Sequence, residues 1–304
     1  MAKKTKETDN GSRFVPCSVK QLPHGQLIAA ARTAIEQNLA NSPAAAAIRM
    51  LARELGRGKA TRDAEVLPPE HIAMLTTKYW GSKGVDLGVY FMDTQDSALK
   101  AKILSYANKW GQYGNIRFRE ASGGNAQVRL ARQRNQGYWS YLGTDILHIG
   151  TRNPTMNLES FSLSVPDSEY DRVVCHEFGH TLGFPHEHMR QEIVALLDPQ
   201  KTISYFQATQ GWSATEVQQQ VLTPLEDSAI SMRTDADTVS IMCYQLPASI
   251  TVNGQPIPGG TAIDKLDGQF AATVYPKEVV PPTPPPSNGV TITVPKAGTY
   301  KLVT

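Results

Sequence analysis

The stretch HEFGHTLGFPHEH at positions 176–188 decides the fold of this chain of 304 residues. On a helix, His176 and His180 lie four residues apart, so both imidazoles project from one face and can hold one metal ion. Gly183 can adopt the left-handed conformation that ends a helix, and the turn would bring His186 to the same ion. Glu177 stands beside the ion, close enough to hold a water molecule without binding the metal. Three protein ligands and an open fourth position are typical of a catalytic zinc, so the stretch predicts one catalytic Zn²⁺.

The spacing H-E-x-x-H-x-x-G-x-x-H is highly specific. Its five fixed positions would arise by chance in a chain of this length at a rate of roughly one in a hundred thousand. The alternative is a helix whose histidines are solvated or hydrogen-bonded. The helix itself is also well supported, because Val174, Phe178 and Leu182 recur every four residues on the side opposite the histidines. Ser168 with Asp171 three residues later predicts a capped start for this helix.

A second element follows downstream, where the chain reads SIMCY at positions 240–244. A methionine turn beneath the metal is the partner that the extended histidine pattern predicts. Met242 would place its polarizable thioether under the imidazoles, packing against them rather than binding the metal. The phenol of Tyr244 could reach the metal as a weak ligand or donate a hydrogen bond to an oxyanion. The alternative for Tyr244 is an ordinary core tyrosine.

These residues give the chain a close resemblance to the astacin-like metzincins, which are zinc endopeptidases, and to their bacterial branch in particular. The resemblance is carried by positions 176–188, by Arg190, by SIMCY, and by GYWSYLG at positions 137–143. It covers roughly residues 67–277. It implies an α+β fold of the metzincin type, in which a mixed twisted sheet and helices lie above an active-site cleft. A less regular lower half would carry His186 and the methionine turn.

The same resemblance assigns roles to residues of this sequence. His176, His180 and His186 would hold the zinc ion. Glu177 would act as general base and then as general acid, and Tyr244 would be a fifth ligand that swings toward the oxyanion.

Further roles follow from the resemblance outside the metal site. The family's Trp-Ser-Tyr strand on the upper rim of the cleft corresponds to Trp139, Ser140 and Tyr141, which would bind substrate. The two aromatic residues of this strand could instead be plain core residues. Glu187 would pair with the buried amino terminus of the mature enzyme.

The three cysteines of the chain, Cys17, Cys175 and Cys243, form no disulfide framework. Cys175 and Cys243 each adjoin a site motif, and we expect two buried thiols there, with a Cys175–Cys243 disulfide as the alternative. Cys243 also stands where the family often has a histidine. The family's Arg-x-Asp-Arg-Asp continuation is missing after Arg190. These departures concern substrate contacts and activation more than the zinc chemistry.

Composition excludes several other functions. The formal charge of +2 and the single short basic run at residues 3–6 give no sign of a nucleic-acid partner. No apolar stretch approaches the length of a membrane span. Residues 1–14 lack the apolar core of a secretory signal. The resemblance, by contrast, implies a protein or peptide substrate and a place outside the cytosol, so we expect a protein that is secreted or exported without a classical signal peptide in this chain. The sequence indicates no oligomeric state.

The chain divides into four predicted parts. Residues 1–67 form a helical amino-terminal extension or prosegment, with helical spacing at 26–38 and 44–55. Residues 68–278 form the catalytic domain, which begins at Pro68-Pro69. Residues 279–287 are a proline-rich linker, and 288–304 are a short β-like tail.

The amino-terminal part has two interpretations. It is either a prosegment that blocks the cleft or a helical extension packed on the domain. In a sharper form of the first, the thiolate of Cys17 occupies the open zinc position until the segment is removed, since thiolate is a good zinc ligand. The family's usual latency motif is built around an aspartate, and the sequence contains no convincing copy of it.

Local patterns predict the elements of the catalytic domain. Strands are expected at 85–91, 116–118, 128–130 and 138–142, and helices at 95–110 and 213–222, the latter with a Ser213–Glu216 capping box. The strand at 138–142 is expected at the edge of the sheet. An exposed edge can pair with an extended peptide through main-chain hydrogen bonds.

Together these observations predict a zinc-dependent endopeptidase that hydrolyses internal peptide bonds through a zinc-activated water, with Glu177 as general base. One alternative is a catalytically silent zinc-containing module that binds peptides in the same cleft. The intact glutamate argues against it, because a binding module has no need of a base beside the metal. A second alternative is a latent zymogen blocked by its amino-terminal segment.

Overall fold

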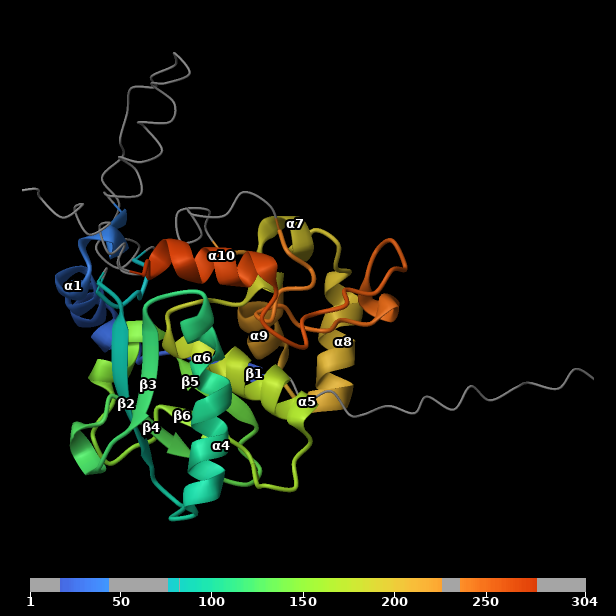
Figure 1. Cartoon of the computed structure of the whole chain (residues 1–304). Helices are drawn as coiled ribbons and strands as arrows, with labels where there is room; N and C mark the ends of the chain where they lie inside the picture. The colour runs from blue at the N-terminus through green and yellow to red at the C-terminus, as the bar shows by residue number, and fades with distance from the viewer. Residues whose placement is uncertain (1–16, 44–75, 82, 226–235, 278–304) are drawn as a thin grey trace, which may run out of the picture.

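The computed structural model describes residues 17–43, 76–81, 83–225 and 236–277 (Figure 1). The helix expected at 44–55, the linker at 279–287 and the tail at 288–304 lie outside the described residues. The four-part division of the chain therefore stays a prediction.

A six-stranded mixed sheet forms one half of the molecule, with the strand order β1-β5-β6-β4-β2-β3. We call it the upper half, after the arrangement that the resemblance implies, although Figure 1 draws it below α10. All neighbours are parallel except β5 and β6. The strands are β1 (Cys17–Lys20), β2 (Val85–Phe91), β3 (Ile116–Glu120), β4 (Val128–Ala131), β5 (Tyr138–Tyr141) and β6 (Met156–Leu158). The four strands expected from the sequence are confirmed. In β2 the residues Val85, Leu87, Val89 and Phe91 are all buried, which is the alternation that a strand with one core face requires.

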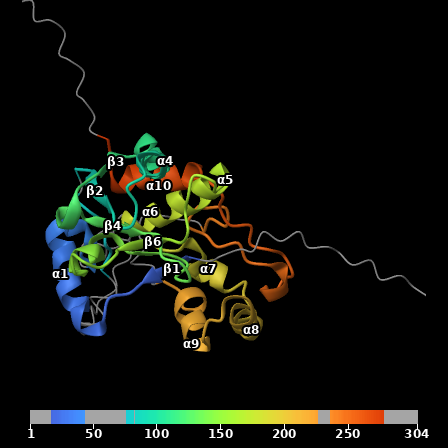
Figure 2. The same cartoon turned by 90° about the horizontal axis from the view of Figure 1, so that it is seen from below.

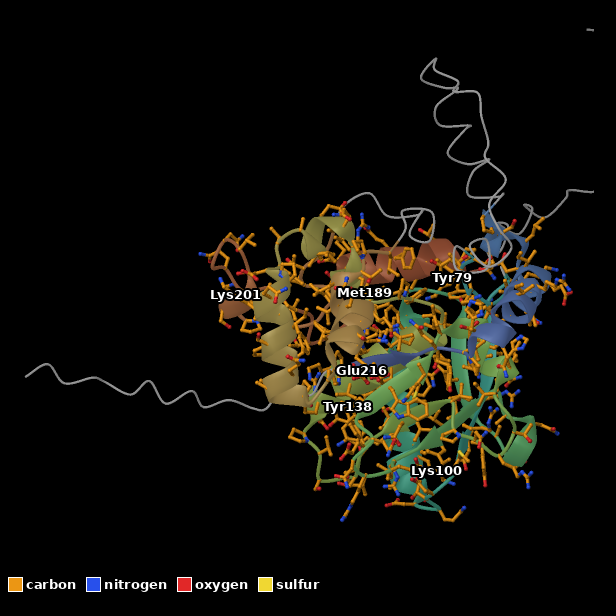
Figure 3. All side chains as sticks on the ribbon, turned by 180° about the vertical axis from the view of Figure 1, so that it is seen from behind. Tyr79, Lys100, Tyr138, Met189, Lys201 and Glu216 are labelled. Carbon is orange, nitrogen blue, oxygen red and sulfur yellow. The ribbon has the colours of Figure 1, made fainter. Side chains whose placement is uncertain are left out.

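The expected edge strand is not at the edge. Strand β1, from the amino-terminal part of the chain, pairs in parallel with β5, so that Cys17 lies opposite Tyr138 and Lys20 opposite Tyr141. Figures 2 and 3 show β1 between the sheet and the region of α9 (Ala214–Val217). The main-chain groups that an exposed edge would offer to a peptide are therefore already occupied by the chain's own segment.

The helices of the upper half bury apolar faces against the sheet. Helix α4 (Ser97–Ala107) continues into the 3₁₀ turn η3 (Asn108–Gln112), which confirms the helix expected at 95–110, and it buries Leu99, Ile103 and Ala107. The side chain of Asp96 accepts hydrogen bonds from the N–H groups of Ala98 and Leu99 and so caps α4. Trp110 at the end of this segment is fully buried, and its Nε1 donates to the carbonyl of Cys175.

The lower half is less regular, as the resemblance implies. It consists of the short helices α7 (Gln191–Val194), α8 (Pro199–Gln210) and α9, the π-helical turn η8 (Gln218–Leu222), and irregular segments up to α10 (Lys265–Val274). The Ser213–Glu216 capping box at α9 is confirmed. A separate hydrophobic cluster includes Phe206, Val217 and Val221, and it also contains Cys17 and Tyr244. The mixed sheet, the helices and this lower half together confirm the α+β metzincin-type fold.

The segment with the two histidines is a long helical run in three parts. It comprises α5 (Asp167–Glu169), the π-helical turn η6 (Tyr170–Val174) and α6 (Cys175–Thr181). The capped start predicted at Ser168 is wrong, because the helix begins directly after Pro166, which has no side-chain group for capping. Acidic side chains in the first turn favour this start through the helix dipole instead. Val174, Phe178 and Leu182 are fully buried, which confirms the predicted core face.

The described amino-terminal part is packed on the domain. Helix α1 (Leu27–Gln37), which confirms the helix expected at 26–38, contacts the 3₁₀ segment η5 (Gly143–His148). The buried amide of Asn41 donates to the carbonyls of Ala34 and Tyr79 and accepts from the N–H of Tyr79. This part of the chain thus combines both interpretations: α1 packs as an extension, whereas β1 lies along the strand expected to bind substrate.

Tyr275 ties the end of α10 to two distant segments, and its removal provides a test of this packing. Its buried hydroxyl donates to the carbonyl of Leu182 at 2.5 Å and accepts from the N–H of Trp80 at 3.0 Å. We expect Tyr275→Phe to lower the free energy of unfolding by about 3 kcal/mol, because both buried backbone groups lose their partner. The measurement is urea unfolding of the full chain. Tyr90→Phe is the control, since the hydroxyl of this half-buried tyrosine makes no hydrogen bond to the described residues. Equal losses in the two variants would contradict the prediction.

Candidate active site

The tautomers of two histidines are fixed by backbone carbonyls. The Nδ1 atom of His176 lies 2.6 Å from the carbonyl oxygen of Ile241, and that of His180 lies 2.8 Å from the carbonyl oxygen of Phe184. A carbonyl oxygen only accepts, so each Nδ1 must carry the proton. The Nε2 atom of each ring is then left with a free lone pair, which is the form that binds a metal.

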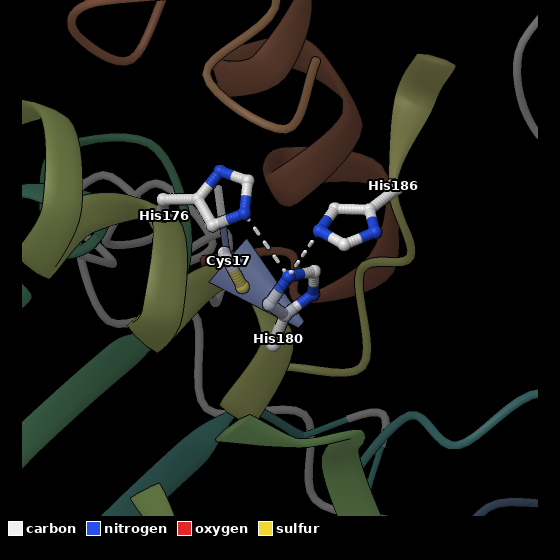
Figure 4. Close-up of side chains that lie close together, drawn as sticks. All are labelled: Cys17, His176, His180 and His186. Carbon is white, nitrogen blue, oxygen red and sulfur yellow. Dashed lines mark hydrogen bonds between the residues drawn. The ribbon is translucent and has the colours of Figure 1, made fainter. Parts of the chain in front are cut away.

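Three such nitrogens converge on one point. The Nε2 atom of His180 lies 3.1 Å from the Nε2 atoms of both His176 and His186 (Figure 4). Gly183 makes this possible, since its φ of +91° turns the chain back after the helix and delivers His186. Nitrogens bound tetrahedrally to zinc at about 2.0–2.1 Å are separated by about 3.3 Å. The spacing therefore fits one Zn²⁺, whose charge would remove the repulsion between the facing lone pairs.

Burial keeps these imidazoles neutral. It lowers the pKa of His176 to about 4, and it lowers the pKa values of His180 and His186 well below the ordinary value. Neutral imidazole is the ligand form, so at neutral pH the rings need lose no proton to bind a metal.

The thiol of Cys17 completes the cluster from the side of β1. Its Sγ atom and one nitrogen of each of the three histidines all lie within 4.8 Å of one another (Figure 4). Cys17 is buried, and this burial raises the pKa of its thiol well above the ordinary value. A neighbouring divalent cation reverses that effect, because it stabilises the thiolate directly. The structure thus brings the predicted latency thiol to the predicted metal ligands.

Glu177 is fully buried beside this cluster. Neither of its carboxylate oxygens has a hydrogen-bond partner of normal geometry among the described residues, although the thiol of Cys17 lies next to it. Burial raises the pKa of Glu177 to about 8, while Cys17 and Arg172 oppose the rise. A carboxyl group without a partner is costly in the interior of a protein. A water molecule held between this carboxyl group and a metal ion would satisfy it.

The methionine turn lies under the metal-facing helix, as expected. A Cβ atom at Gly179 would come within 2.5 Å of the Sδ atom of Met242, so the bare glycine lets the thioether reach the helix. The turn is fixed by Asp267 of α10, whose carboxylate accepts from the hydroxyl of Ser240 and the N–H of Ile241. Ile241 in turn orients the His176 ring. This role of Asp267 is not evident from the sequence, because its spacing from Asp264 indicates only a helix cap.

Tyr244 is buried with its ring against the histidines. Its ring centroid lies 4.5 Å from that of His186 and 3.9 Å from that of His188, on which it stacks. Its hydroxyl donates to the carbonyl oxygen of Cys17. His188, for which the sequence predicts no role, supports the ring of Tyr244 by this stacking. The Nε2 atom of His188 lies 3.0 Å from the carbonyl oxygen of Gln220.

The strand predicted to bind substrate is β5. Trp139, Ser140 and Tyr141 lie opposite Ser18, Val19 and Lys20 of β1. The strand therefore offers its main chain to an extended segment, although here the segment belongs to the same chain. The rings of Trp139 and Tyr141 contact each other edge to face. That these residues bind substrate stays a prediction.

Two further expectations concern residues near the site. The carboxylate of Glu187 accepts from the N–H of Asp237 at 3.1 Å and lies 3.9 Å from the guanidinium of Arg190. The amino terminus lies outside the described residues, so its pairing with Glu187 stays a prediction. Cys175 and Cys243 are both free and buried, which excludes the disulfide alternative.

None of the described helices combines the length and the apolar character that crossing a membrane requires.

Comparisons with known proteins agree with this geometry. Residues 74–251 match the family model described as Astacin, a peptidase family. Two solved structures of myroilysin are similar to the chain. One has 31% sequence identity and a TM-score of 0.61, and the match covers 66% of this chain and 97% of that one. The other has 32% identity and a TM-score of 0.51, covering 66% and 86%. A comparison with curated protein sequences finds no match.

The family match spans more than half of the chain and contains the histidine cluster, Glu177 and the methionine turn. The chain belongs to the astacin family of zinc-dependent metalloendopeptidases.

Proposed function

We propose that this endopeptidase uses Glu177 as its general base and Tyr244 as its oxyanion donor, and that Cys17 holds the described form in a latent state. One observation carries the proposal. The buried carboxyl group of Glu177, whose oxygens have no hydrogen-bond partner of normal geometry in the described part of the chain, adjoins three converging imidazole nitrogens, and Cys17 approaches the same point from β1.

Glu177 is placed to move protons at the scissile bond. When bound, the zinc ion acts as a Lewis acid that polarises the scissile carbonyl and makes an attacking water more acidic. The carboxylate of Glu177 accepts the proton of that water and later passes it to the leaving amine. Its burial favours the second step, because the raised pKa makes the protonated form accessible. The positive charge of the metal offsets part of this rise and keeps the base form available.

Tyr244 is placed to bind a carbonyl oxygen. Burial raises the pKa of its phenol well above the ordinary value, so the hydroxyl stays protonated and remains a donor. In the structure it already donates to a peptide carbonyl, that of Cys17. The same hydroxyl can donate to the oxyanion of a substrate once β1 has left.

Cys17 occupies several positions that a substrate needs. Its sulfur lies in the metal cluster, its carbonyl takes the hydrogen bond of Tyr244, and its strand pairs with β5. This triple occupation supports the latent zymogen rather than the silent binding module. The buried carboxyl group of Glu177 also supports a latent enzyme over a binding module, because peptide binding alone requires no general base.

The metal ligands can be tested by zinc content. We expect the purified full chain to hold one zinc ion and His180→Ala to lose it, because the central ring contacts both other ligands. His148→Ala is the matched control, since His148 lies outside the cluster and contacts Thr33. Zinc is measured by elemental analysis after dialysis. Unchanged zinc in His180→Ala would contradict the assignment.

The two catalytic roles can be separated from metal binding. We expect Glu177→Ala and Glu177→Gln to keep zinc but to lower kcat by several orders of magnitude, roughly 10²–10⁴-fold for a lost general base. Tyr244→Phe should keep zinc and lower kcat roughly a hundredfold. Glu120→Ala, on the exposed end of β3, is the control and should change nothing. The assay is hydrolysis of an unfolded protein, with and without chelator, after limited proteolysis near Pro68. Wild-type turnover in Glu177→Gln would remove Glu177 from the mechanism.

Latency can be tested without proteolysis. We expect the full chain to cleave an unfolded protein slowly and Cys17→Ala to cleave it at least tenfold faster, because the loss of a zinc ligand weakens the hold of β1. Ser18→Ala, one position along the same strand, should behave like the wild type. If the intact wild type and Cys17→Ala are equally active, Cys17 does not maintain latency.

A further inference from the structure

Strand β1 is held from two sides. On one side it pairs with β5. On the other side the N–H of Val19 donates to Oε1 of Gln220 at 3.3 Å, and Nε2 of Gln220 donates to the carbonyl oxygen of Val19 at 3.4 Å. A single carboxamide therefore satisfies both main-chain groups of one residue.

This contact copies the pairing of a β-strand. In an extended chain the N–H and C=O of one residue point to the same side, and those of the next residue point to the other side. A carboxamide presents one acceptor and one donor, as a neighbouring strand does. The contact involves no side-chain atom of Val19. It is therefore open to an extended segment of any sequence.

Gln220 is anchored to the catalytic side chains. It lies in the π-helical turn η8, a geometry that is frequent at functional sites. The following residues, Val221 and Leu222, are buried. The carbonyl of Gln220 also receives a hydrogen bond from His188, which stacks on Tyr244. The carboxamide and the phenol thus face the same segment from one connected support.

We propose that Gln220 is a substrate-binding residue, whose carboxamide holds the main chain of an extended peptide opposite β5 after β1 has left. This inference rests on the proposed function. It names a second wall of the cleft that recognises peptide backbone, in addition to the strand Trp139–Tyr141.

The first experiment needs no catalytic activity. The full chain is treated with a thiol reagent, and the rate of labelling at Cys17 is followed by mass spectrometry. We expect Gln220→Ala to raise this rate about tenfold, because two hydrogen bonds that hold β1 closed are lost. Gln219→Ala is the control, since that exposed neighbour lies in the same turn. Equal labelling rates for wild type and Gln220→Ala would contradict the conclusion that the carboxamide of Gln220 holds β1 in place.

The second experiment addresses substrate directly. The full chain is activated by limited proteolysis and assayed on peptides that each carry one N-methylated amide. We expect Gln220→Ala to raise KM about tenfold with little change in kcat. N-methylation at one position of the peptide should raise KM for the wild type but not for Gln220→Ala. A merely structural role of Gln220 would not produce this coupling.

Identical N-methylation penalties in both enzymes would overturn the substrate role. Gln220→Glu is a second variant of similar size, in which the acceptor is kept and the donor lost; it should show an intermediate KM. If the wild type proves inactive, the proposed function fails, while labelling of Cys17 still decides whether Gln220 holds the main chain.

Discussion

The structure depends on one constraint: three imidazoles must present free Nε2 lone pairs to a single point. Each ring needs its proton held on Nδ1 and its orientation fixed. Backbone carbonyls from separate segments do this for His176 and His180. The carbonyl of Ile241 belongs to the methionine turn, which Asp267 of α10 fixes in place. The carbonyl of Phe184 follows the turn at Gly183. The upper sheet, the lower half and α10 therefore all contribute to orienting two rings, and this explains why a long chain is needed to build a small metal site.

The sequence predicts structure formed by residues that are close together in the chain, but not contacts between residues that are far apart in it. The spacing of His176, His180 and His186 fixes their approach to one ion, because helix geometry and a glycine turn determine it. The strands of the sheet are likewise readable from alternation. The cap at Ser168 was wrong because Pro166 starts the helix without any capping side chain. The pairing of β1 with β5 could not be foreseen, since it links residues far apart in the chain through main-chain groups that leave no pattern in the side chains. The contacts of Gln220 and Asp267 likewise join residues far apart in the chain and leave no pattern in the sequence.

In the proposed latent state, the amino-terminal segment competes with substrate for the cleft. Its main chain, its carbonyl and its sulfur each take a position that the proposed mechanism gives to a substrate, so this latency would need no rearrangement of Glu177 or Tyr244. Helix α1 and the buried amide of Asn41 keep β1 attached to the domain, which gives the segment a high effective concentration at the cleft. A free peptide must compete against that concentration. After cleavage of the chain between β1 and the catalytic domain, the released segment would be diluted and would lose its high effective concentration at the cleft.

Main-chain recognition also explains why a thiol is needed. Hydrogen bonds from β5, Gln220 and Tyr244 are directed to backbone groups of β1, and under the proposed function they would bind the backbone of a substrate as well. A segment held only by such bonds would itself be open to cleavage, because its carbonyl would lie beside the zinc ion and Glu177. In the proposed latent state, the sulfur of Cys17 would be the fourth ligand of a bound zinc ion and would exclude the water that Glu177 would activate. In this proposal the amino-terminal segment differs from a substrate in one sulfur atom, which adds a metal contact to the backbone hydrogen bonds on either side of β1.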